Sequence, residues 1–95
     1  MALTFEWDPQ KAASNLEKHG VSFDEAITAF ADPTGRLVID DRHSHDELRL
    51  VLLGQSAARR YLAVMFTNRA PDRIRIISAR PASRRERRQY EEGRG

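Results

Sequence analysis

The spacing of apolar residues along this chain changes near residue 36, from a helical repeat to an extended one. In the segments 12–19 and 23–30, apolar or aromatic side chains recur every three or four residues, which places them on one face of a helix. Beyond residue 36 the apolar residues are mostly aliphatic or β-branched, in short runs separated by polar, turn-prone segments. Four strands are therefore predicted, over residues 36–41, 47–54, 60–68 and 73–80.

Capping residues mark the ends of the two helices. Asp8 stands before Pro9, and Gly20 follows the last apolar repeat, so the first helix is predicted between an Asp N-cap and a left-handed Gly C-cap. Ser22 and Glu25 have the spacing of a capping box at the start of the second helix. The Asp-Pro pair at positions 32 and 33 should end that helix.

The remaining elements complete a compact order. A short strand is predicted at residues 3–7, and a last helix follows Ser83, whose spacing to Glu86 is again that of a capping box. Short connections favour an antiparallel meander for the four later strands. The expected fold is thus α+β: a short strand, two N-terminal helices, a four-stranded antiparallel meander and a C-terminal helix. One domain, residues 1–95, should hold them all, with residues 91–95 as a frayed tail.

The last strand has an ambiguous facing. Alternation along it places Ile74 and Ile76 on the same face as Ser78 and Arg80. This mixed set of side chains leaves open which face of the strand meets the helices and which meets solvent or a ligand.

Composition narrows the possible functions. The chain has 95 residues and no cysteine, which excludes disulfides and thiolate chemistry. Its first residues, MALTFEWDPQ, contain neither a signal peptide pattern nor an apolar span, so we expect a cytoplasmic protein without a membrane partner.

Charge is distributed unevenly along the chain. Residues 1–50 carry five basic and ten acidic residues, and residues 51–95 carry eleven basic and four acidic ones. Arginine holds phosphate oxygens bidentately and stacks on bases, so an arginine-rich sheet with a basic helix alongside is typical of an RNA-handling surface. There are two plainer explanations of the arginines. The last helix can be a solvated helix stabilised by ion pairs between its own side chains, and the use of arginine can follow from genome composition. The arginines of this predicted platform are Arg49, Arg59, Arg60, Arg69, Arg73, Arg75 and Arg80.

Two histidines suggest a metal site that the rest of the sequence does not support. His43 and His45 alternate ahead of Asp46 and Glu47, as zinc ligands can. A zinc site needs a third or fourth protein ligand, and no other His or Cys cluster supplies one. We therefore predict a polar turn at this segment, with no metal and no other cofactor.

Lys18 and His19 occupy the last turn of the first helix, where the helix dipole favours positive charge. Spacing alone favours an electrostatic cap at this position. The functional alternative is that the two side chains project from the helix end toward a phosphate.

Four stretches of the chain, taken in order, carry a resemblance to a known family. They are FEWDPQKAASNLEKHGVSFDEAITAF, DRHSHDELR, ARRYLAVMFTNR and RIRIISARPASRRERRQYE. Together they resemble the BrnT family of toxins from type II toxin-antitoxin systems, over roughly residues 4–91. The ordered set is more specific than any one of the four stretches.

The resemblance implies a ribonuclease with a RelE-like fold, in which helices pack on one side of an antiparallel sheet and the substrate lies on the other. RelE-like nucleases cut without a metal, because the substrate's 2′-hydroxyl attacks the adjacent phosphate. The resulting hypothesis makes His19 or Glu47 the proton acceptor. Lys18, Arg69 and Arg80 would stabilise the charge on the phosphate.

A second set of residues is expected to hold the RNA. It comprises Arg49, Arg59, Arg60, Arg73, Arg75, Arg84, Arg88 and Tyr90, with Tyr90 also able to stack on a base or assist proton transfer. RelE-like families do not share one catalytic set, so the group is predicted more firmly than any single role.

The resemblance also implies partners. The substrate is RNA, free or ribosome-bound, whose cleavage would inhibit translation and growth. A BrnA-type antitoxin with a ribbon-helix-helix domain would neutralise the toxin and carry the complex to operator DNA.

The rival reading is a non-catalytic module that binds RNA or an acidic protein through the basic face. Electrostatic binding of RNA requires no proton transfer, so the clustering of arginines fits a non-catalytic module equally well. Turnover of RNA separates the two readings.

Overall fold

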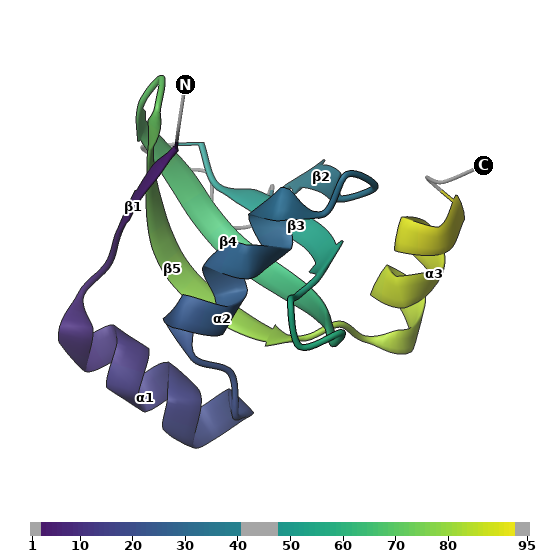
Figure 1. Ribbon diagram of the computed structural model, residues 1–95, viewed down its shortest axis with the longest axis horizontal. Coiled ribbons are helices and arrows are strands. Elements are labelled where there is room, and N and C mark those ends of the chain that lie inside the picture. The colour runs from purple at the N-terminus through teal and green to yellow at the C-terminus, as the bar shows by residue number, and fades with distance from the viewer. Residues whose placement is uncertain (1–2, 41–47, 93–95) are drawn as a thin grey trace.

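The computed structural model describes residues 3–40 and 48–92, and Figure 1 shows how they are arranged. The elements follow the predicted order: β1 (Thr4–Glu6), α1 (Pro9–His19), α2 (Phe23–Thr28) with the 3-10 turn η1 (Ala29–Ala31), β2 (Arg36–Ile39), β3 (Leu50–Gln55), β4 (Tyr61–Ala70), β5 (Arg73–Pro81) and α3 (Arg84–Glu92). The predicted helices and strands are confirmed in type and order. Glu91 and Glu92, which were expected to fray, belong to α3.

The strands form one five-stranded mixed sheet in the order β1-β5-β4-β3-β2. Strands β2 to β5 make the predicted antiparallel meander. The expectation of a purely antiparallel sheet is wrong, because β1 pairs in parallel with β5, with Thr4 opposite Arg73. The chain reaches β5 only after both helices and three strands, so no local pattern near β1 could announce this partner.

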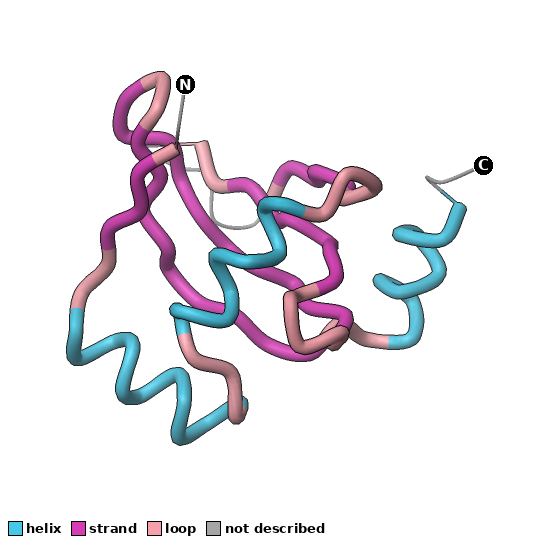
Figure 2. Tube along the Cα trace, in the orientation of Figure 1, coloured by secondary structure: helices cyan, strands magenta, loops and turns pink. Residues whose placement is uncertain are grey.

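Helices cover both faces of the sheet. On one face Val21, which precedes α2, and Phe23 and Ala26 of α2 pack against inward-facing residues of the strands, such as Val64 and Ile76. On the other face Tyr90 of α3 packs with a second, smaller cluster. Figure 2 shows α3 set apart from α1 and α2, so the one-sided packing implied by the family resemblance holds for α1 and α2 only.

The predicted caps are present at the helix ends. The Asp8 carboxylate accepts a hydrogen bond from the Gln10 amide at 2.9 Å, and Gly20 takes the left-handed conformation at φ 69°. At α3, Ser83 and Glu86 form the full reciprocal capping box, with N···O distances of 2.9 and 3.1 Å. These local bonds satisfy backbone amides that would otherwise lack a partner in the first turn.

A bulge in β5 corrects the predicted facing of that strand. Ser78 lies opposite Met65, but Ile76 lies opposite the next residue of β4, so Ile77 is an extra residue without a partner. An inserted residue inverts the alternation beyond it. Ala79 therefore joins Ile74 and Ile76 in the core, and Ser78 and Arg80 face the side on which α3 lies.

Tyr90 fastens α3 to the rest of the fold. Its ring is 4% exposed and lies edge-on to Tyr61, with centroids 5.4 Å apart. Its hydroxyl donates to Asp32 at 2.8 Å and lies 2.7 Å from the Thr34 hydroxyl. Burial alone would raise the pKa of Asp32, but hydrogen bonds from the Gln55 and Thr34 amides and from Tyr90 lower that pKa to about 2.

Candidate functional site

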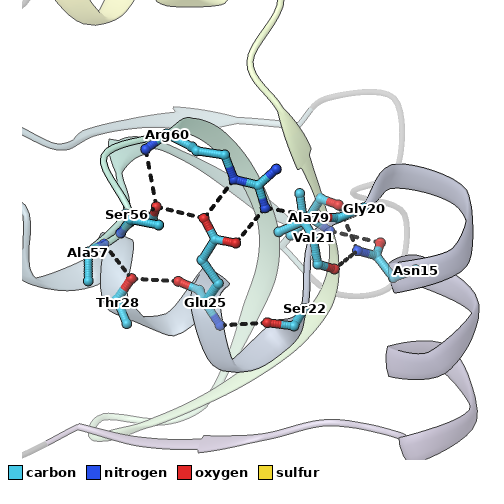
Figure 3. A network of polar contacts seen from close by, with 11 residues as sticks. Asn15, Gly20, Val21, Ser22, Glu25, Thr28, Ser56, Ala57, Arg60 and Ala79 are labelled. Atoms are coloured by element: carbon cyan, nitrogen blue, oxygen red, sulfur yellow. Dashed lines mark hydrogen bonds and ion pairs between the residues drawn. The ribbon is translucent and has the colours of Figure 1, made fainter.

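Several arginines of the predicted platform are held in ion pairs within the fold. Arg60 donates to both oxygens of Glu25 and to the Gly20 carbonyl, the latter at 2.9 Å. The Ser56 hydroxyl donates to the same carboxylate at 2.7 Å, as Figure 3 shows. The Arg60 hydrogen bond is the main reason why the pKa of Glu25 is lowered. Arg60 thus ties the β3–β4 turn to α2, and Glu25 serves this network rather than a complete capping box.

Arg80 makes a bidentate pair with Glu86, with N···O distances of 2.6 and 2.8 Å. The Glu86 carboxylate also accepts from the Ser83 amide, so one side chain both caps α3 and holds Arg80. The Arg80 hydrogen bonds are the leading cause of the lowered pKa of Glu86. As the chain stands, Arg80 connects β5 to the start of α3.

The other predicted arginines occupy separate parts of the surface. Arg75 and Arg73 pair with Glu6 at 3.0 and 3.5 Å, across the β1–β5 pairing. Arg69 is exposed where the β4–β5 register shifts a second time, and Arg59 is exposed in the β3–β4 turn at φ 65°. Arg84 and Arg88 are exposed on α3. The structure therefore does not gather these side chains into one platform.

Tyr90 also departs from its predicted role at the surface. Its buried ring and two hydroxyl contacts occupy it within the fold, so a base could stack on it only after α3 had moved.

Two lysines and a histidine gather along one side of α1. Lys11, Lys18 and His19 line a hollow of about 180 Å³ together with Ser14, Asn15, Ile77 and Ser78, and none of these lining residues is acidic. Lys11 and Lys18 form no ion pair with any carboxylate of residues 3–40 or 48–92. This hollow therefore offers two lysines and a histidine to a ligand with no carboxylate in its lining.

A second hollow continues the first across the sheet. It has a volume of about 170 Å³ and is lined by Asp40, Arg49, Met65, Ile77 and Ser78. Both hollows share Ile77 and Ser78, the residues at the β5 bulge. We call the combined surface the bulge groove. It runs from α1, over the edge of β5, to the face that α3 leaves open.

The edge of β5 is accessible to α1 because β1 pairs with β5 only at residues 73–75. Beyond them the edge is held by Asn15, which is 5% exposed. Its side-chain oxygen accepts from the Ala79 amide at 3.0 Å, and its amide group donates to the Ala79 and Val21 carbonyls at 2.7 and 2.9 Å. Asn15 thereby takes the place of a neighbouring strand and fixes α1 beside the bulge (Figure 3).

Of the predicted catalytic residues, the structure brings Lys18 and His19 together in the bulge groove, and Arg49 joins them from the RNA-binding set. Glu47 lies outside the described residues, as do the two histidines of the polar turn. The sequence reading missed Lys11, Ser14 and Asn15. A signal was present, since the chain has only two lysines, which stand seven residues apart on one helix.

The chemistry of the groove fits a phosphodiester. Ammonium and guanidinium groups stabilise charge on phosphate oxygens, and an imidazole can take up or release a proton. Within residues 3–40 and 48–92 there is no group of three or more His, Cys, Asp or Glu side chains that could hold a metal ion. Nor does the described part contain a helix long and apolar enough to cross a membrane.

Comparison with solved structures identifies the fold. The chain superposes on the 1.1 Å crystal structure of the Brucella abortus ribonuclease toxin, BrnT, with a TM-score of 0.66 and 22% identity. The match covers 87% of this chain and 100% of that one. The α+β fold, with three helices and a five-stranded mixed sheet, is therefore similar to that of BrnT.

The sequence identifies the family. Residues 7–86 match the family described as "Ribonuclease toxin, BrnT, of type II toxin-antitoxin system". The chain belongs to this family of ribonuclease toxins, and the predicted resemblance is confirmed. No curated protein matches the chain.

Asn15 offers a direct test of how the groove is held together. Asn15→Ala leaves the Ala79 amide and carbonyl without their side-chain partner, and each unsatisfied buried group costs about 1–3 kcal/mol. We expect the free energy of unfolding, measured with urea, to fall by about 2–4 kcal/mol. Ser14→Ala, at the exposed neighbouring position, is the control and should change stability by no more than about 0.5 kcal/mol. Equal stability of the two variants would contradict the idea that Asn15 holds α1 to the edge of β5.

Proposed function

We propose that this chain is the toxin of a type II toxin-antitoxin pair and cleaves RNA, without a metal ion, in the bulge groove. The observation that carries the proposal is a hollow lined by two lysines and a histidine and free of carboxylates, in a chain of a ribonuclease family. Arg60, Arg73, Arg75 and Arg80 each pair with a carboxylate of the fold and lie outside the linings of the two hollows.

The proposed reaction needs only groups of the substrate and the groove. His19 accepts the proton of the substrate's 2′-hydroxyl, whose oxygen attacks the adjacent phosphorus. Lys18 and Arg49 stabilise the charge that builds on the non-bridging oxygens. The bond from phosphorus to the 5′-oxygen then breaks, and that oxygen takes up the proton that His19 accepted, so His19 returns to its starting state. The products end in a 2′,3′-cyclic phosphate and a 5′-hydroxyl.

Three other residues that the sequence suggested keep a role in the proposal. Glu47 is the alternative proton acceptor. Arg80 is placed by its pair with Glu86 to position α3 beside the open face, and Arg69 stays a predicted charge stabiliser. The relation to RelE-like nucleases is likewise a proposal, supported by the lysines and the histidine that line the groove.

The proposed partners follow from the family. A toxin of a type II system is paired with an antitoxin, and we propose one of the BrnA type, whose ribbon-helix-helix domain would bring the complex to operator DNA. Cleavage of messenger RNA, free or on ribosomes, would then lower translation until the antitoxin is bound.

The first test is cleavage by purified protein, freed of antitoxin, acting on bulk RNA in excess EDTA. Wild type should cleave, and His19→Ala should be slower by about 100-fold or more, the usual loss for a general base. Glu17→Gln, an exposed position on α1 outside the hollow, is the matched control and should cleave like wild type. Full activity of His19→Ala, or intact RNA that is merely protected stoichiometrically, would contradict the assignment.

A second test separates the two roles open to Arg80. If Arg80 positions α3, Arg80→Ala and Glu86→Gln should lower the midpoint of urea unfolding and the cleavage rate by similar factors. The double variant should then lose no more than either single one. Loss of cleavage in Arg80→Ala with normal cleavage in Glu86→Gln would instead place Arg80 on the RNA.

A further inference from the structure

Lys11 is a cation that the proposed reaction does not use. It lines the same hollow as Lys18 and His19 but stands at the other end of α1. At 1.5 Å per residue, the separation of seven positions between the two lysines corresponds to about 10 Å along the helix axis. A phosphate beside His19 lies next to Lys18 in the chain and two helical turns from the backbone of Lys11, so Lys11 is better placed to bind a neighbouring phosphate.

Ser14 lies between the two lysines and on the same side of α1. The spacings of three and four residues from Lys11 to Ser14 and from Ser14 to Lys18 put the three side chains in one row on the helix. All three line the hollow, and Asn15 lies buried beneath the row, bound to Ala79 of β5. The row is therefore fixed in distance from the bulge at which cleavage is proposed.

We propose that Lys11 and Ser14 form a second phosphate-binding subsite, which holds the backbone of single-stranded RNA next to the cleaved linkage. This inference rests on the proposed function. An ammonium group and a hydroxyl can each donate to a phosphate oxygen, and neither reads a base, so the subsite would position RNA without sequence preference. A single strand can bend from the open face over the β5 edge and follow α1, whereas recognition of duplex RNA depends on regularly spaced grooves.

A second phosphate subsite predicts that the effect of Lys11 depends on the length of the RNA substrate. A dinucleotide contains one phosphodiester, which occupies the cleavage site and leaves nothing for Lys11 to hold. A tetranucleotide supplies neighbouring phosphates on both sides of a central linkage. The contribution of Lys11 should therefore appear only with the longer substrate.

The experiment compares wild type, Lys11→Ala, Lys11→Arg and Gln10→Ala on a dinucleotide and a tetranucleotide in EDTA. With the tetranucleotide, Lys11→Ala should raise KM about tenfold, since a charged hydrogen bond contributes about 1.5–3 kcal/mol, and should leave kcat within about twofold. With the dinucleotide it should match wild type. Lys11→Arg should restore KM, and Gln10→Ala, at an exposed neighbouring position, should have no effect.

Salt dependence gives an independent readout. For tetranucleotide binding, the slope of log affinity against log salt concentration should be less steep in Lys11→Ala by about 0.7, the value for one phosphate contact on a single strand. An unchanged KM and salt slope in Lys11→Ala, with wild type cleaving both substrates, would overturn the subsite alone. Absence of cleavage by wild type on every RNA would overturn the proposed function instead.

Discussion

The hydrogen bonds between the Asn15 side chain and Ala79 are the constraint on which the site depends. They satisfy both backbone groups at an edge of β5 that has no strand beside it, and they do so from a helix. A buried amide with all its partners in place fixes geometry more tightly than apolar contact, because a shifted partner would leave polar groups unsatisfied. The distance between α1 and the β5 bulge, and hence the shape of the bulge groove, follows from this contact.

Electrostatics then decides which cations remain available for a ligand. Glu25, Glu6 and Glu86 each take up an arginine that joins two elements of the fold. The lysines of α1 are left beside a hollow without acidic residues. Four of the eleven arginines in residues 51–95, namely Arg60, Arg73, Arg75 and Arg80, thus join elements of the fold, whereas the basic residues of the hollow all come from the acidic first half of the chain.

Patterns among neighbouring residues predicted the helices and strands well. They could not predict contacts between residues far apart in the sequence. The caps at Asp8 and Ser83 and the strand runs depend on neighbours in sequence, and the structure has them where the sequence placed them. The parallel pairing of β1 and the capture of Arg75 by Glu6 join residues 69 positions apart. No residue type demands the bulge at Ile77, so simple alternation put Ser78 and Arg80 on the wrong face. The first helix ends at the Gly20 cap, as predicted, and this end places Lys18 and His19 in the lining of one hollow; their catalytic role stays a prediction.

The most direct test of the central claim is to find where RNA binds. Backbone amide shifts would be followed by NMR while a short single-stranded RNA with 2′-O-methyl groups, which lacks the attacking hydroxyl, is added. If RNA binds in the bulge groove, the largest changes in amide chemical shift should fall in α1 and at residues 76–80 of β5. Shifts concentrated in α3 or in the β3–β4 turn, with α1 unchanged, would contradict it.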